Sequence, residues 1–184
     1  MPERKDNVMK GSKKLLYVMD VILAILLIAA DQWTKVLAYR HLGGKEDIIL
    51  IEGVFQLHYL ENRGAAFSMF QDARLLFVLA TIVMMSVILY VLIKVPAGKR
   101  YVMWHICLTL IGAGGIGNLI DRLRFAYVVD FLYFSLIDFP VFNVADICVT
   151  VGVAFLVIFI LFVWKEEDLK FMDLKIRKEE KSVK

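Results

Sequence analysis

The residues of this sequence that could do chemistry are polar side chains placed where long apolar segments begin or end, or in the connection between two such segments. They are Asp31, Lys35, Asn118, Asp121, Arg122, Asp130, Asn143 and Asp146. Carboxylates dominate the set, and burial tunes such groups to act as general acids and bases. Two aspartates held together in a poorly solvated site tend to share one proton, so one can deprotonate a water while the other protonates a carbonyl oxygen. These residue types suit the chemistry of an aspartic protease.

Other catalytic chemistries lack their residues. The histidines His41, His58 and His105 are scattered and form no His-Glu-x-x-His motif, so zinc proteolysis is not supported. No serine stands in a Gly-x-Ser-x-Gly context. Cys107 is expected near the inner end of one span and Cys148 near the outer end of another, which disfavours both a disulfide and thiol chemistry. We expect neither a metal nor an organic cofactor.

The composition places this chemistry in a membrane. Of the 184 residues, 60% are hydrophobic, above the roughly 45–50% of a soluble domain. Charged residues make up 22%, a normal share, so apolar and charged residues must be segregated along the chain. Four segments have about the 20 apolar residues needed to cross a bilayer, namely 15–38, 75–93, 102–120 and 144–164. The first exceeds a typical signal-peptide core and lacks an Ala-x-Ala site, so we expect it to be retained.

The positive charges orient these segments. Five Lys and Arg residues lie in 1–14, three in 94–100 and seven from Lys165 onward, which leaves seven for the other two connections and the adjoining segment ends. By the positive-inside rule, both termini are cytoplasmic and residues 39–74 and 121–143 are extracytoplasmic.

The predicted fold is an all-α membrane protein with four transmembrane helices plus a small extracytoplasmic β-sheet and loop/helix region. Ile48–Ile51 and Val54–Leu60 have the pattern of short strands, separated at Glu52 and Gly53. The run 127–134 could add a further extended segment. The expected organisation is a cytoplasmic segment 1–14, a transmembrane domain 15–164 and a charged cytoplasmic tail 165–184.

This orientation brings the polar residues to one depth. Asp31 lies near the outer end of the first span, Asp121 follows the third, and Asp146 lies in the first turn of the fourth. Asp130 lies in the connection between the last two spans. An ionisable residue near the membrane core is a candidate for function because burying it unpaired is costly. We therefore expect a single site near the boundary of the outer leaflet.

Three further features receive no catalytic role. Asp20, near the inner end of the first span, is interpreted as a snorkelled or helix-paired charge. Trp33, Trp104 and Trp164, near span ends, are expected to be interfacial anchors. For the tail from Lys165, a solvated topogenic segment is favoured over an amphipathic interfacial helix.

Five motifs in order add a resemblance to a known family. They are Asp31-x-x-Thr34-Lys35, Asn62-Arg63-Gly64-Ala65-Ala66-Phe67-Ser68, Gly117-Asn118-x-x-Asp121-Arg122, Val128-Val129-Asp130-Phe131 and Phe142-Asn143-x-Ala145-Asp146. Together with four spans, they closely resemble bacterial lipoprotein signal peptidase (signal peptidase II) over roughly Leu15 to Trp164. That family comprises aspartyl endopeptidases of the bacterial cytoplasmic membrane.

The resemblance implies that Asp130 and Asp146 are the catalytic pair. Asp121 is the rival for the first role, because its motif is equally distinctive. We rank it second because Arg122 is adjacent and a carboxylate committed to an ion pair is a poor proton shuttle. Asn143 is expected to orient the pair or its water.

The remaining motif residues are expected to bind substrate or to support the site. Asn62, Asn118 and Arg122 suit the binding of peptide carbonyls. Asp31 and Lys35, four residues apart, are expected to form a supporting ion pair. The small residues Gly64, Ala65 and Ala66 would keep the surface thin where a substrate backbone approaches.

The resemblance also implies the partners. The substrate would be a prolipoprotein cut just before a cysteine that carries diacylglycerol, and globomycin would inhibit the cleavage. Membrane lipids are further partners, no nucleic acid is expected, and we expect a monomer.

Two rival functions remain open. In a proton-linked transporter or channel the carboxylates would form a relay, but the ionisable groups gather at one depth, the second span has none and no inverted repeat is visible. A non-catalytic lipoprotein-binding chaperone would survive loss of both aspartates.

Overall fold

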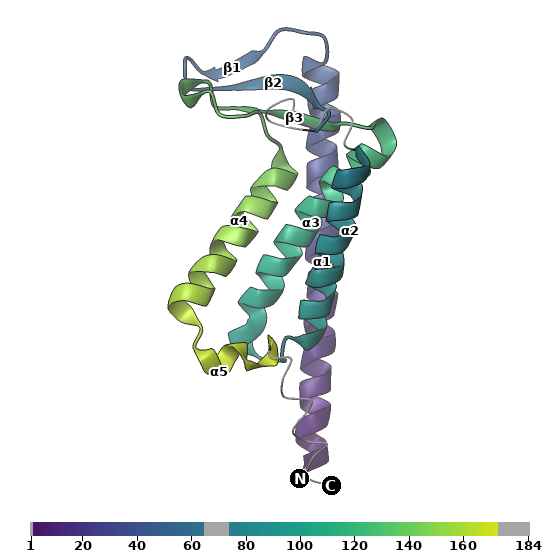
Figure 1. The fold of residues 1–184 in the computed structure, drawn as a ribbon, viewed down its shortest axis with the longest axis vertical. Coiled ribbons are helices and arrows are strands. Elements are labelled where there is room, and N and C mark those ends of the chain that lie inside the picture. The colour runs from purple at the N-terminus through teal and green to yellow at the C-terminus, as the bar shows by residue number, and fades with distance from the viewer. Residues whose placement is uncertain (1, 65–73, 173–184) are drawn as a thin grey trace.

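The computed structural model describes residues 2–64 and 74–172, and for residues 2–12 the helical backbone alone. Figure 1 shows long helices packed alongside one another with a small sheet across one end of the bundle. Two parts of the predictions, motif residues 65–68 and tail residues 173–184, lie outside the described residues.

Four of the helices are long and apolar enough to cross a membrane. They are α1 (Pro2–Leu42), α2 (Arg74–Lys94), α3 (Val102–Phe125) and α4 (Val144–Ile158), the last continued by a π-helical turn, η3 (Phe159–Val163). The predicted class, a four-span helical membrane protein with a small sheet, is confirmed. α3 continues beyond residue 120 to Phe125 and ends at Ala126, which adopts a left-handed conformation with a φ of 65°.

α3 is the central helix and contacts each of the other three. Its small residues allow close packing: a Cβ at Gly114 would overlap the backbone carbonyl oxygen of Ala145 in α4, and one at Gly117 would lie 2.6 Å from a carboxylate oxygen of Asp31 in α1. Backbone therefore lies against backbone where α3 meets α4, as in close-packed membrane helices. This contact fixes the start of α4 relative to α3.

The sheet has three antiparallel strands, β1 (Ile48–Ile51), β2 (Phe55–Asn62) and β3 (Val128–Tyr133), in that order. The pairing of β2 with β3 sets Leu60 opposite Asp130 and Asn62 opposite Val128. Val129 and Phe131 pack on Ala38 and Leu42 at the end of α1. The alternation of a strand therefore buries one face of β3 on α1 and leaves Asp130 on the other face.

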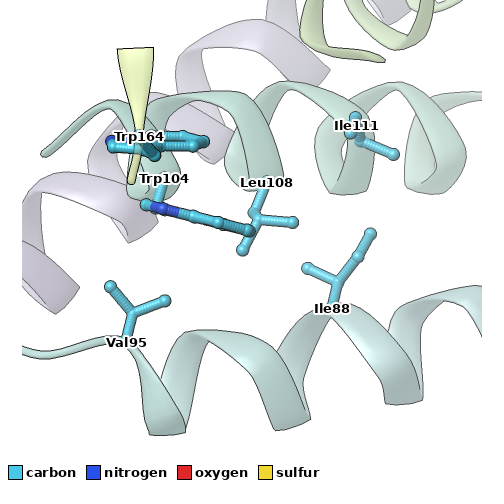
Figure 2. Close-up of a cluster of buried hydrophobic side chains, with 6 residues drawn as sticks. All are labelled: Ile88, Val95, Trp104, Leu108, Ile111 and Trp164. Carbon is cyan, nitrogen blue, oxygen red and sulfur yellow. The ribbon is translucent and has the colours of Figure 1, made fainter. Parts of the chain in front are cut away.

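The opposite end of the bundle is closed by aromatic residues. Trp104 of α3 and Trp164, just after η3, stack with ring centroids 4.5 Å apart, and both are buried within an apolar cluster (Figure 2). The expectation that these two tryptophans are interfacial anchors was wrong, because the ends of α3 and α4 lie close enough for the indoles to cover each other. Trp33 is 66% exposed.

The first part of the tail folds back on this cluster. α5 (Glu166–Leu169) and a 3-10 turn, η4 (Lys170–Met172), follow Trp164. Arg100 donates two hydrogen bonds to the carboxylate of Asp168, and Phe171 packs edge-on against Trp104. The interpretation as a solvated tail was wrong for Asp168, Leu169 and Phe171, which pack against the rest of the fold, whereas the other residues of 165–172 are exposed.

Candidate active site

Asp130 lies in the middle of β3 with a carboxylate that is only 1% exposed. The side-chain amide of Asn62 donates to Oδ2 at 2.8 Å, and that of Asn143 donates to Oδ1 at 2.6 Å. Asn62 reaches Asp130 because β2 pairs with β3. Both oxygens of the buried carboxylate are therefore hydrogen bonded.

Asp146 lies in the first turn of α4, where it forms a capping box with Asn143. The side-chain oxygen of Asn143 accepts from the backbone N–H of Asp146 at 3.0 Å, and Oδ2 of Asp146 accepts from the backbone N–H of Asn143 at 3.1 Å. An Asn three residues before an acidic residue at a helix start is typical of this motif. Asn143 thus hydrogen bonds to both Asp130 and Asp146 and holds the two carboxyl groups beside one another.

Asn118 of α3 completes the connections around the two aspartates. Its Nδ2 donates to Oδ1 of Asp146 at 2.8 Å. Its Oδ1 accepts from Asn143 Nδ2 at 3.1 Å and from Lys35 Nζ at 2.9 Å. The amide orientation of Asn118 is therefore fixed by donors on one side and a carboxylate on the other.

Lys35 is a buried ammonium with three acceptors. Its Nζ lies 2.9 Å from Oδ2 of Asp31, 2.9 Å from Oδ2 of Asp121 and 2.9 Å from Oδ1 of Asn118. The expected pair of Asp31 with Lys35 is present, and the structure adds Asp121 from α3. Oδ1 of Asp31 also accepts from the backbone N–H of Ala145 at 2.9 Å, so the cluster joins α1, α3 and α4.

Asp121 is held in this cluster and not by its neighbour in sequence. Besides Lys35, it accepts from the backbone N–H of Val129 at 3.2 Å and from the side chain of Gln32 at 2.9 Å. Among the described residues, no ion pair joins it to Arg122. Asp121 is therefore committed to an ion pair with Lys35 instead of Arg122, and a carboxylate so committed is a poor proton shuttle.

Two of the residues expected to bind peptide carbonyls have other partners. The amides of Asn62 and Asn118 donate to the aspartates, and Oδ1 of Asn62 accepts from the backbone N–H of Gly64 at 3.1 Å. Arg122 donates to the backbone carbonyl of Asn118 at 3.4 Å and lies over the ring of Phe77. In this arrangement Asn62 and Asn118 hold carboxylates. Gly64, with a φ of 131°, adopts a conformation that favours glycine.

The pKa of Asp130 is raised from 3.8 to about 7, chiefly because burial disfavours its charged form. The hydrogen bond from Asn62 opposes this shift, and the nearby charge of Asp146 adds to it. The carboxyl group can therefore be protonated near neutral pH, as acid catalysis requires.

One residue of the buried cluster, Gln32, was missing from the sequence prediction. Gln32 donates to Asp121 at 2.9 Å and to the carbonyl oxygen of Gly117 at 3.2 Å, so it belongs to the buried cluster. Its position next to Asp31, within an otherwise apolar span, was the available signal. Nearer the N-terminus of α1, Oδ2 of Asp20 lies 2.7 Å from Nδ1 of His105 in α3, and its Oδ1 accepts from the hydroxyl of Thr109 at 3.3 Å. Asp20 is therefore paired with a neighbouring helix, which is one of the two interpretations given from the sequence.

A buried carboxyl group, Asp130, and a half-buried one, Asp146, share a hydrogen-bonding asparagine at one end of a bundle of membrane-crossing helices, and such a pair of carboxyl groups is what a membrane-embedded aspartic protease needs. Within the described ranges, no group of three or more His, Cys, Asp and Glu residues could hold a metal ion.

Comparison with known proteins gives the family. Residues 23–162 match the family model for signal peptidase (SPase) II. The lipoprotein signal peptidase of Streptococcus pyogenes serotype M5 (strain Manfredo) is 44% identical over 157 residues, which cover 85% of this chain and 97% of that protein. The chain therefore belongs to the signal peptidase II family, the membrane proteases of aspartic type that cleave signal peptides from prolipoproteins.

Two solved structures share the fold. Both are described as bacterial membrane enzymes determined by the in meso method, at 2.3 Å and 1.9 Å resolution. Each is 28% identical to this chain, with TM-scores of 0.69 and 0.71. The matches cover 80% and 79% of this chain and 92% and 94% of those chains.

Proposed function

We propose that Asp130 and Asp146 are the catalytic pair, and that they hydrolyse the peptide bond just before the diacylglyceryl-modified cysteine of a prolipoprotein. The observation that carries this proposal is the position of Asn143, which hydrogen bonds to Asp130 through its side chain and to Asp146 through its backbone and side chain. The raised pKa of Asp130 supports a pair that shares one proton near neutral pH.

The pair then acts as acid and base in turn. The ionised carboxylate takes a proton from water, whose oxygen attacks the carbonyl carbon, while the protonated carboxyl gives its proton to the carbonyl oxygen. In the resulting gem-diol, the carboxyl that gained a proton gives it to the amide nitrogen and the C–N bond breaks. A hydroxyl proton returns to the other carboxylate, which restores the shared proton.

The surrounding residues position this pair. Asn143, Asn62 and Asn118 fix the carboxylate orientations. The buried cluster of Asp31, Lys35 and Asp121 joins α1 to α3, which carries Asn118, and to the start of α4, which carries Asp146. Arg122, which is not paired with Asp121, is placed to bind a substrate carbonyl.

The site belongs to the outer side of the bacterial cytoplasmic membrane, with both chain termini in the cytoplasm. This orientation rests on the excess of Lys and Arg in 1–14, 94–100 and the tail. The enzyme acts as a monomer, since one chain supplies both carboxylates and their partners. A globomycin-like cyclic peptide inhibits it by occupying the same site.

Exchange of either carboxylate tests the assignment. Asp130→Asn and Asp146→Asn should remain inserted in the membrane and lose at least about a thousandfold in the rate of cleavage of a diacylglyceryl-modified precursor in detergent. Asp47→Asn is the matched control, because Asp47 contacts His58 on the sheet, away from the pair. Wild-type cleavage should stop when globomycin is added.

Normal processing by either variant would overturn the assignment. Ion flux into liposomes without precursor cleavage would instead favour a transporter, and binding of precursor that survives loss of both aspartates would favour a chaperone.

A further inference from the structure

A recess lies beside Asp146, under the segment that leads into α4. Its volume is about 390 Å³, and it is lined by residues 139–142 together with Asp146, Ile147, Thr150 and Val151 of α4. The lining is mostly apolar, and the α4 part runs from the active-site carboxylate toward the membrane interior.

The recess faces away from the bundle. The buried residues of α4, Ala145, Cys148 and Gly152, face α3. With 3.6 residues per turn, Ile147 and Val151 then lie on the other side of the helix, where they are 41% and 37% exposed. In a membrane this side of α4 meets lipid, so the recess opens to the bilayer.

Residues 139–142, which cover the recess, are held in place by aromatic packing. Phe142 packs against Phe139 and Phe134, with ring centroids 5.7 and 5.8 Å away, and exchanges backbone hydrogen bonds with Leu132 of β3. The cover is therefore tied to the strand that carries Asp130. A group in the recess would contact one catalytic residue directly and the strand of the other.

We propose that this recess receives one acyl chain of the diacylglyceryl group on the substrate cysteine. The inference rests on the proposed function, in which the lipid is attached one residue after the scissile bond. An acyl chain so close to the two aspartates needs an apolar surface that adjoins them and remains open to the bilayer, and the recess has both properties. A second cavity, of about 280 Å³ between α1 and the sheet, is lined by Leu37, Leu57 and Phe131 among others and includes neither aspartate.

A bulky side chain in the recess tests the proposal. Val151→Trp should lower kcat/KM about tenfold for a precursor with long acyl chains, because the indole occupies the space of the chain. The same variant should cleave a short-chain precursor within about twofold of the wild-type rate. Leu161→Trp is the matched control, since Leu161 is 66% exposed on the same helix at its other end and lies outside the recess. It should cleave both precursors normally.

A precursor with a photoactivatable group in its acyl chain provides an independent readout that does not depend on a substituted protein. Crosslinks to wild-type enzyme should map to residues 139–151. Crosslinks confined to α1 or α2 would overturn the assignment of the acyl chain to this recess. The same holds if Val151→Trp loses activity equally on the long-chain and short-chain precursors, or loses none on the long-chain precursor. Because wild-type cleavage and its loss in Asp130→Asn are measured alongside, these outcomes are separate from failure of the catalytic assignment.

Discussion

The Asp130 carboxyl sets the pH range in which the pair can work. Its pKa is raised to about 7 by burial and by the charge of Asp146, so Asp130 keeps its proton below about pH 7 and loses it above that pH. The acid of the reaction is then missing. We expect kcat/KM to fall about tenfold per pH unit above about pH 7, measured with a diacylglyceryl-modified precursor in detergent.

A substitution at Asn62 should move the alkaline limb of the pH profile, the pH range in which kcat/KM falls. The hydrogen bond from Asn62 lowers the pKa of Asp130, so Asn62→Ala should raise that pKa and shift the alkaline limb to higher pH. A change in maximal rate without a shift of the limb would contradict the account, because a purely structural defect leaves the limb in place.

Lys35 neutralises two buried carboxylates at once, and its removal leaves both unpaired. Lys35→Met should therefore destabilise the protein by about 3–5 kcal/mol, seen as a lower melting temperature in detergent. Lys45→Met is the matched control: that lysine is exposed, and in the part of the chain that the structure describes its side chain donates to the backbone carbonyl of Arg40 and forms no ion pair. Equal melting temperatures for the two variants would refute the role of the buried cluster.

Local spacing made part of the site predictable. The i, i+4 spacing of Asp31 and Lys35 indicated their ion pair, and Asn143 three residues before Asp146 has the spacing of a capping box. The pairing of Lys35 with Asp121 joins two helices, so it depends on how they are rotated about their axes, which local sequence does not determine.

At the scale of elements, the contact of α3 with α4 determines where Asp146 stands. Gly114→Ala should destabilise the protein and reduce cleavage, because its Cβ would overlap the backbone carbonyl of Ala145, next to Asp146. Gly115→Ala is the control on the same helix, since its Cβ would overlap the terminal methyl of Met84, which can move, and would lie at an ordinary contact distance from Thr81. Melting temperature and cleavage rate of both variants check this, and equal effects would contradict it.

The elements themselves follow closely from patterns in the sequence. Apolar runs of sufficient length indicated the four spans, short apolar runs indicated β1 and β3, and alternation indicated β2. The folded-back segment 165–172 was missed because its mixture of charged and apolar residues also suits a solvated tail. Only the aromatic cluster around Trp104, formed by distant parts of the chain, provides the surface on which it packs.

At the scale of the whole molecule, the ends of the bundle differ in kind. One end carries the sheet, the two aspartates and the lysine cluster, whereas the other is closed by stacked tryptophans and the short helix α5 (Figure 1). Positive charges are concentrated in the segments at the second end, because the connection between α2 and α3 and the sequence after Trp164 are rich in Lys and Arg. The positive-inside rule then predicts which end faces the cytoplasm.

This sidedness can be read from the labelling of single added cysteines. Glu52 lies in the exposed turn between β1 and β2, and Lys99 is exposed between α2 and α3, at the opposite end of the bundle (Figure 1). The native Cys107 and Cys148 are only 0% and 6% exposed, so background labelling should be low. In intact spheroplasts a membrane-impermeant maleimide should label Glu52→Cys at once and Lys99→Cys only after permeabilisation. The reverse pattern would place the two aspartates on the cytoplasmic side, where a lipoprotein precursor anchored in the outer leaflet could not reach them.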